Sequence, residues 1–158
     1  MPAGDVTAWE IVAAVPDPEL PVLTLEDLGV LRSVDVDQSG SVLVTLTPTY
    51  SGCPAMDAMR ADVQRALLGA GYRNVAIQFE LAPAWTTDQL GPLAREHLAA
   101  AGIAPPGEPG TPVALSLKCP QCGSLRTREA SHFGATSCKA LWQCSACGEP
   151  FEHLKVLR

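Results

Sequence analysis

The stretch SVLVTLTPTYSGCPAMDAMRADVQRALLGAGYRNVAIQFEL, residues 41–81, decides the fold of the N-terminal part of this chain. It begins with alternating apolar residues and ends with the alternating run NVAIQFEL, residues 74–81, and this period of two is typical of half-buried strands. Between the two runs, apolar residues recur at helical spacing and stop at Gly69. The helical positions are Met56, Met59, Val63 and Leu67. The stretch therefore predicts strand, helix and strand, with the last strand joining the sheet of the first.

The residues before this stretch add a helix and a hairpin. Thr7-Ala8-Trp9-Glu10 has the form of a capping box, which predicts a short helix that ends at Pro16. An extended, proline-rich loop follows. The segment VLRSVDV, residues 30–36, is then separated from the next strand by the turn DQSG, residues 37–40, so we expect a β-hairpin.

A further helix is predicted after the last strand of the stretch. Thr86-Thr87-Asp88-Gln89 reads as a second capping box, and the expected helix runs to about Ala101. Its expected buried side consists of Leu90, Leu93, His97 and Leu98. The resulting order α-β-β-α-β-α predicts an α+β fold, a small two-layer α/β sandwich in which helices cover one face of the sheet.

Four of the six cysteines lie in two CxxC-G motifs, CPQCG at residues 119–123 and CSACG at residues 144–148. The two-residue spacer lets both sulfurs of a motif face one ion, and two motifs complete a tetrahedral site. The predicted metal ligands are Cys119, Cys122, Cys144 and Cys147. Zinc is the expected ion, although an iron or iron–sulfur centre uses the same ligands.

The cysteine motifs also divide the chain. The proline- and glycine-rich segment at residues 103–112 is expected to link a first domain, residues 1–102, to a four-cysteine metal ribbon, residues 113–158. The alternative is that the cysteines form disulfides or stay free. We disfavour it because the sequence shows no secretion signal and no membrane span, so the expected location is the reducing cytoplasm.

Charge disfavours nucleic acid as a partner. Residues 1–112 carry 14 acidic and 5 basic side chains, a balance of -9, and an acidic body repels a phosphate backbone. Residues 113–158 carry 3 acidic and 6 basic side chains, and the basic ones are scattered. A ribbon with exposed aromatic residues could still bind single strands, but this is the weakest of the functional hypotheses.

Two cysteines lie outside the CxxC motifs. Cys138 is interpreted as a packing residue of the ribbon, with an additional metal or redox role as the alternative. Cys53, in TYSGCPAM, is predicted at the N-cap of the central helix with Pro54 at its first position. There the helix dipole would favour a reactive thiolate, yet a buried packing cysteine would explain the sequence equally well.

Three parts of the chain together resemble the PaaD family of phenylacetate-degradation proteins. They are DPELPVLTLEDLGVLRSVDV at residues 17–36, VTLTPTYSGCPAMDAM at residues 44–59, and the tail with its two CxxC-G motifs. The first domain is similar to the SufT-type iron–sulfur assembly domain, whose marks are an Asp-Pro-Glu loop and a Cys-Pro helix start. The resemblance therefore implies that Cys53, Asp17 and Glu19 take part in iron or cluster transfer.

The resemblance also implies a function. It indicates an accessory or maturation factor for the iron or iron–sulfur centres of the phenylacetyl-CoA 1,2-epoxidase complex, one that performs no catalysis of its own. The implied partners are the oxygenase and reductase subunits and iron–sulfur client proteins, and the implied cofactors are structural zinc and a transient cluster. The alternative is a structural or electron-transfer subunit of the same oxygenase. One cysteine per chain cannot complete a stable cluster site, so two chains could share it as a homodimer.

Overall fold

A computed structural model describes residues 6–110 and 116–157. The chain divides into two compact units, Met1–Gly91 and Pro92–Arg158. The helix and the short strand that follow Gly91 belong to the second unit. From the sequence, the first domain was predicted to end at residue 102 and residues 103–112 were predicted to be a linker. Within the described residues, the structure has no helix whose length and apolar character would let it span a bilayer.

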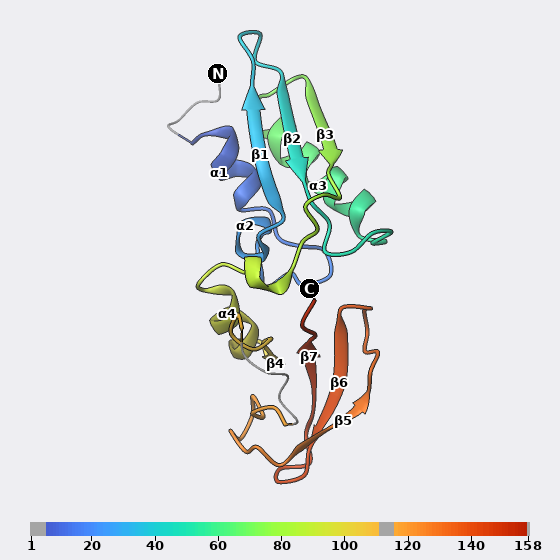
Figure 1. Cartoon of the computed structure of the whole chain (residues 1–158). Coiled ribbons are helices and arrows are strands. Elements are labelled where there is room, and N and C mark those ends of the chain that lie inside the picture. Colours follow the sequence, from blue (N-terminus) through green and yellow to red (C-terminus); the bar gives the residue numbers. More distant parts are fainter. Residues whose placement is uncertain (1–5, 111–115, 158) are drawn as a thin grey trace. The chain divides into compact units, whose positions relative to one another are not determined.

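The N-terminal unit is a three-stranded sheet with helices on one face (Figure 1). The strand order is β1-β2-β3, in which β1 is antiparallel and β3 parallel to β2. The elements are α1 (Ala8–Ala13), α2 (Leu25–Leu28), β1 (Leu31–Val36), β2 (Val42–Leu46), α3 (Met56–Gly69), β3 (Val75–Phe79) and the 3-10 helix η1 (Thr87–Gln89). The α+β class and the predicted strand, helix and strand over residues 41–81 are confirmed.

The core of this unit lies between the sheet and α3. The residues of β2 that face the helices are at most 2% exposed, and they are Val42, Val44 and Leu46. From α3, the buried residues are Met59, Val63 and Leu67, at the helical spacing seen in the sequence. Alternation in a strand and helical spacing in the neighbouring helix thus bury two matching apolar surfaces against each other.

Helix α2 was not expected from the sequence. Its four residues follow Thr24, whose hydroxyl accepts from the backbone N–H of Asp27 while the Asp27 carboxylate accepts from the N–H of Thr24. Gly29 ends the helix with a φ of 75°, a conformation that suits glycine. The three nearby prolines predict an extended loop, but the capping box at Thr24 stabilises one turn of helix immediately after them.

The prediction of a single capped helix over residues 86–101 is wrong. Thr86 makes no capping hydrogen bond with its side chain; η1 ends at Gln89, and α4 (Ala94–Ala100) begins only after Pro92. Because proline has no N–H and clashes with the preceding turn, it breaks the expected helix in two. Leu90 and Leu98 are buried as predicted, but Leu93 is 52% exposed and His97 is also exposed.

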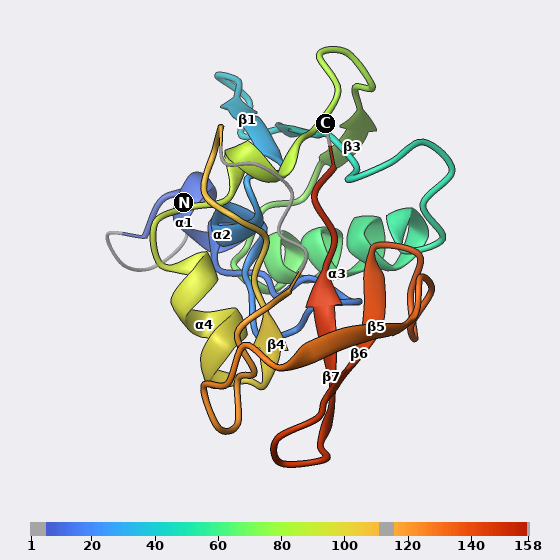
Figure 2. The same cartoon turned by 60° about the horizontal axis from the view of Figure 1, so that its bottom comes forward.

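The C-terminal unit is a four-stranded sheet in the order β4-β7-β6-β5 (Figure 2). Its strands are β4 (Ile103–Ala104), β5 (Thr127–Ser131), β6 (Lys139–Cys144) and β7 (Pro150–Leu154), and α4 packs beside β4. Strand β6 is antiparallel to both β5 and β7, and β4 is parallel to β7. The small core consists of Ala104, Cys119, Ala140, Trp142, Cys144 and Phe151.

Candidate metal centre and the Cys53 site

The four predicted metal ligands of the C-terminal unit converge on one point. The sulfur atoms of Cys119, Cys122, Cys144 and Cys147 all lie within 4.8 Å of one another. Cys119 Sγ is 3.8 Å from Cys147 Sγ, and Cys122 Sγ is 3.6 Å from Cys144 Sγ. A tetrahedral zinc ion with sulfur ligands at about 2.3 Å holds its sulfurs roughly 3.8 Å apart. The donor set therefore fits a single tetrahedral metal ion.

Each CxxC-G motif folds as a tight turn that directs both sulfurs to the same side. The N–H of Gly123 donates to the carbonyl of Cys119, and the N–H of Gly148 donates to the carbonyl of Cys144, at 2.9 and 3.0 Å. Both glycines have positive φ, 76° and 81°, which explains why glycine follows each motif. Matching backbone turns thus present two cysteines each, as the spacing predicted.

Two thiols of the cluster have pKa values shifted in opposite directions. Hydrogen bonds lower the pKa of Cys144 to about 7. The backbone N–H of Cys147 contributes most, and the N–H of Ala146 and the neighbouring thiols contribute less. The pKa of Cys147 is raised to about 12: the N–H of Glu149 favours its thiolate, but hydrogen bonds from its thiol to the other sulfurs hold the proton. A positive ion at the centre of the group would favour the thiolate forms of these cysteines.

Cys138 lies apart from this cluster. It is 5% exposed, its sulfur is 3.1 Å from the hydroxyl oxygen of Thr136, and its carbonyl accepts from the N–H of Lys155. Among the described residues, the group that could hold a metal consists of the other four cysteines of the tail. These surroundings are those of a packing residue, and a metal or redox role for Cys138 stays a prediction.

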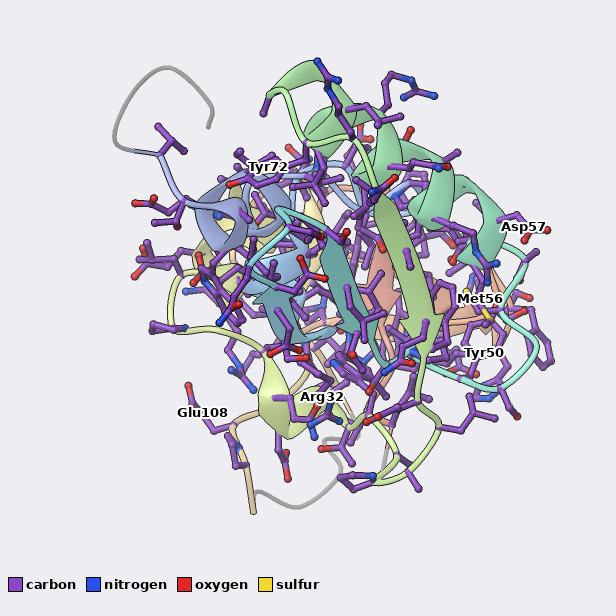
Figure 3. The ribbon with its side chains drawn as sticks, turned by 90° about the horizontal axis from the view of Figure 1, so that it is seen from above. Arg32, Tyr50, Met56, Asp57, Tyr72 and Glu108 are labelled. Carbon is purple, nitrogen blue, oxygen red and sulfur yellow. The ribbon has the colours of Figure 1, made fainter. Side chains whose placement is uncertain are left out.

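Cys53 is not the N-cap of the central helix, so that prediction is wrong. Helix α3 begins at Met56, and Ala55 is its N-cap. The N–H of Cys53 donates to the carbonyl of Tyr50 at 3.3 Å, and the carbonyl of Cys53 accepts from the N–H of Met56 at 3.2 Å. Bonds between residues three apart form tight turns, so Cys53 lies in the turns that lead into α3, where Figure 3 labels Tyr50 and Met56.

The environment of Cys53 raises the pKa of its thiol instead of lowering it. Burial is the largest cause, since the residue is 6% exposed. The N–H of Ala55 and the side chain of Tyr50 act in the opposite direction by hydrogen bonding to the sulfur. The negative charges of Glu19 and, to a smaller extent, Asp17 add to the increase. The resting thiol is therefore protonated at neutral pH, which agrees with the buried cysteine and not with the reactive thiolate, the two alternatives that the sequence left open.

The Asp-Pro-Glu loop reaches the neighbourhood of Cys53. Asp17 is 4% exposed, and its Oδ1 accepts from the N–H groups of Glu19 and Leu20 at 2.9 and 2.7 Å. Burial raises the pKa of Asp17, and these two hydrogen bonds partly offset the increase. One oxygen of Asp17 thus shapes the loop, as expected for a turn residue. Glu19 is partly buried, and its charge acts on the Cys53 thiol more strongly than that of Asp17.

Tyr50 is a residue of this site that was not singled out in the sequence. Both its carbonyl and its side chain interact with Cys53. The signal was available, because Tyr50 precedes Cys53 by three residues and Gly52, which has a φ of 77°, permits a tight turn between them. A tyrosine at this spacing can place its hydroxyl against the sulfur.

Comparisons with known proteins cover both units. Residues 7–86 match the family described as iron-sulfur cluster assembly protein, and residues 105–155 match the PaaD zinc beta ribbon domain. The chain is 42% identical over 151 residues to a protein of Escherichia coli named as a putative subunit of 1,2-phenylacetyl-CoA epoxidase, covering 94% of this chain and 91% of the relative. It is 37% identical over 81 residues to an Fe-S protein maturation auxiliary factor of Porphyromonas gingivalis, covering 51% and 76%.

A solved structure agrees with these matches. The crystal structure of the domain of unknown function DUF59 from Bacillus anthracis is 25% identical to the chain and superposes with a TM-score of 0.53. It covers 58% of this chain, and the match covers 87% of that protein. The chain therefore belongs to the iron-sulfur cluster assembly protein family, and within it to the PaaD proteins, which carry a C-terminal zinc beta ribbon.

Proposed function

We propose that this protein is an accessory factor that delivers iron or an iron–sulfur cluster to the phenylacetyl-CoA epoxidase system and is not itself the catalytic subunit. Two relatives support the proposal by their names: one is a putative component of 1,2-phenylacetyl-CoA epoxidase, and the other is an Fe-S protein maturation auxiliary factor. The first aligns with nearly the whole chain, ribbon included. The partners would be the oxygenase and reductase subunits and their iron–sulfur centres.

The observation that carries the proposal is the shared environment of Cys53, Asp17 and Glu19. A buried thiol lies within electrostatic reach of two carboxylates, and both carboxylates make its ionisation harder. The site therefore carries negative charge with which a cation would interact favourably. A ferrous ion or a cluster arriving as cargo would supply the positive charge, since thiolate sulfur suits soft iron–sulfur units and carboxylate oxygen suits ferrous iron.

The protonated resting thiol fits a carrier better than a permanent binding site. Cargo binding would displace the thiol proton, and protonation of the same sulfur would favour release. Tyr50 and the N–H of Ala55 hydrogen-bond to the sulfur and would stabilise the thiolate while cargo is held. One cysteine per chain makes the binding transient, unless a client or a second chain completes the ligand set.

The four-cysteine centre has a different role in this proposal. Zinc would join the two CxxC-G turns and hold the ribbon folded, because the motif glycines and the sulfur separations suit a closed tetrahedral site. Cys119 and Cys144 are 1% exposed and form part of the small core, so the ion would be integral to the fold. The ribbon would then dock the client while the N-terminal unit offers the cargo.

The test compares wild type with three variants purified anaerobically. Cys53→Ser should fold normally and keep one zinc per chain, but it should bind less iron on reconstitution and support less epoxidase activity in cells. Cys144→Ser should lose the zinc. Cys138→Ser, also a buried cysteine, is the matched control and should behave as wild type. Unchanged epoxidase activity in the Cys53→Ser strain would exclude Cys53 from the mechanism.

The name of the Escherichia coli relative, which calls it part of the epoxidase, supports one alternative: an electron-transfer component of the oxygenase with iron in the four-cysteine centre. Visible absorption of the purified protein would distinguish this alternative from the carrier. Iron ligated by four cysteines, or an iron–sulfur cluster, absorbs visible light and bleaches on reduction, whereas zinc is colourless. Visible absorption that Cys144→Ser abolishes and Cys53→Ser leaves intact would favour this alternative over the carrier.

A further inference from the structure

We propose that two copies of this chain pair through the outer edge of β3, antiparallel, so that their three-stranded sheets form one continuous sheet. Strand β3 lies at the end of the order β1-β2-β3. In the part of the chain that the structure describes, its only strand partner is β2. An open edge of this kind is a template for pairing with another chain. The inference goes beyond the proposed function, and its test requires no iron.

The backbone of β3 has unused hydrogen-bonding groups along this edge. The carbonyl of Asn74 accepts from β2 at 2.7 Å, and the N–H of Glu80 donates to β2 at 2.9 Å. In a parallel pair, alternate residues bond to the same neighbour, so the even-numbered residues of β3 serve β2. The N–H and C=O groups of Val75, Ile77 and Phe79 therefore point to the outer edge.

The side chains on this edge are apolar and incompletely covered. Val75, Ile77 and Phe79 are only partly buried, although β2 residues at the same register and on the same face are at most 2% exposed. Leu68 of α3 is 46% exposed and lines the same surface hollow as Val75. The five residues of β3 contain no charge and no proline, the devices that usually protect an edge strand, although the Arg60 guanidinium of α3 lies over the Phe79 ring, 5.3 Å from its centroid.

The charges at the two ends of β3 favour a second copy of this chain as the partner that pairs with this edge. Arg73 precedes the strand and Glu80 follows it. Antiparallel pairing centred on Ile77 places Val75 opposite the partner's Phe79 and Glu80 opposite the partner's Asn74, so each acidic end lies one position from a basic residue, the partner's Arg73. Parallel pairing would instead bring like charges together. The edge is thus self-complementary, as a two-fold interface requires.

The expected affinity is modest. A stable interface typically buries about 800 Å² per partner, and one short strand with its neighbouring side chains falls below that size. We therefore expect a monomer–dimer equilibrium in the micromolar range. Sedimentation velocity of the full-length, metal-loaded chain over a concentration series should show a single reversible dimer.

Two apolar-to-lysine variants distinguish edge pairing from other modes. Ile77→Lys introduces a charge at the centre of the edge and should weaken the dimer at least about tenfold. Leu43→Lys makes a comparable change on the central strand, where Leu43 is 37% exposed, and should leave the dimer unchanged. Dissociation by Leu43→Lys but not by Ile77→Lys would mean that the sheets pack face to face and would overturn the proposal.

Charge reversal provides a test that spares the core. Arg73→Glu and Glu80→Arg should each weaken the dimer at low salt, because each places like charges at neighbouring positions of the two strand ends. Amide exchange gives a direct readout: the N–H of Ile77 should become protected only at high concentration, whereas that of Gln78 should be protected throughout. A chain that stays monomeric, or a dimer that none of these variants affects, would overturn the proposal.

Discussion

Removal of one metal ligand should unfold the C-terminal unit while the N-terminal unit stays folded. Cys144 is the sharpest position for this change, because it is 1% exposed, ends β6 and belongs to the same core cluster as Trp142 and Phe151. Only six buried residues make up that cluster, and two of them are metal ligands. Leu98 and Leu154 add two large buried side chains to the unit, but the metal site still lies within its small core, so we expect the ion to supply much of the stability of the ribbon.

The magnitude follows from the coupling of metal binding to folding. A structural zinc ion contributes about 10–16 kcal/mol of binding free energy, which in small ribbons is folding free energy. Whole domains are stable by only about 5–15 kcal/mol. Cys144→Ser leaves three of the four ligands and replaces a thiolate in the core by a hydroxyl. The variant should lose the ion, and with it a binding free energy comparable to the stability of a whole domain, so the unit should unfold.

The assay combines metal content with amide exchange. Wild type should hold one metal ion per chain and show protected amides in both sheets. In Cys144→Ser, or after treatment with a strong chelator, the amides of β5, β6 and β7 should lose protection while those of β1 to β3 keep it. Cys138→Ser should match wild type. Retained protection of the β6 amides in metal-free protein would refute the reasoning, because the ion would then not be what holds the ribbon.

Two further predictions concern the N-terminal unit. Gly29→Ala should lower the free energy of unfolding by about 2–4 kcal/mol in denaturant titrations, because Gly29 has a φ of 75° and an added Cβ would overlap the carbonyl of Gln89. Gly40→Ala has a similar φ of 83° but open space around it, so a loss as large as that of Gly29→Ala would contradict the clash. Alkylation of Cys53, followed on its own peptide, should be slow at pH 7 and should still be accelerating at pH 9.0, the ordinary pKa of the thiol, because burial raises the pKa of this thiol. Glu19→Gln removes a negative charge and should speed the reaction at a fixed pH, whereas rapid alkylation of wild type at pH 7 would show that the thiol is ionised at rest.

Local patterns in the sequence were enough for the central elements of the fold. Alternation over residues 74–81 predicted β3, and helical spacing from Met56 to Leu67 predicted α3, because each pattern spans one element and its buried face. The region after β3 was harder. Thr86 and Gln89 have the residue types of a capping box, which predicted that a helix begins there. Pro92 breaks this segment, so the 3-10 helix η1 and helix α4 are separate elements.

The metal centre and the Cys53 site differ in what the sequence could determine. CxxC-G spacing fixes which sulfurs share an ion, since each pair is joined by a turn of a few residues, and the four sulfur atoms lie together as predicted. The properties of Cys53 depend on residues distant along the chain. Only the tertiary structure brings Asp17 and Glu19 within electrostatic reach of it and buries its sulfur. Desolvation and charge depend on three-dimensional surroundings, so only the tertiary structure decided that the pKa of this thiol is raised and not lowered.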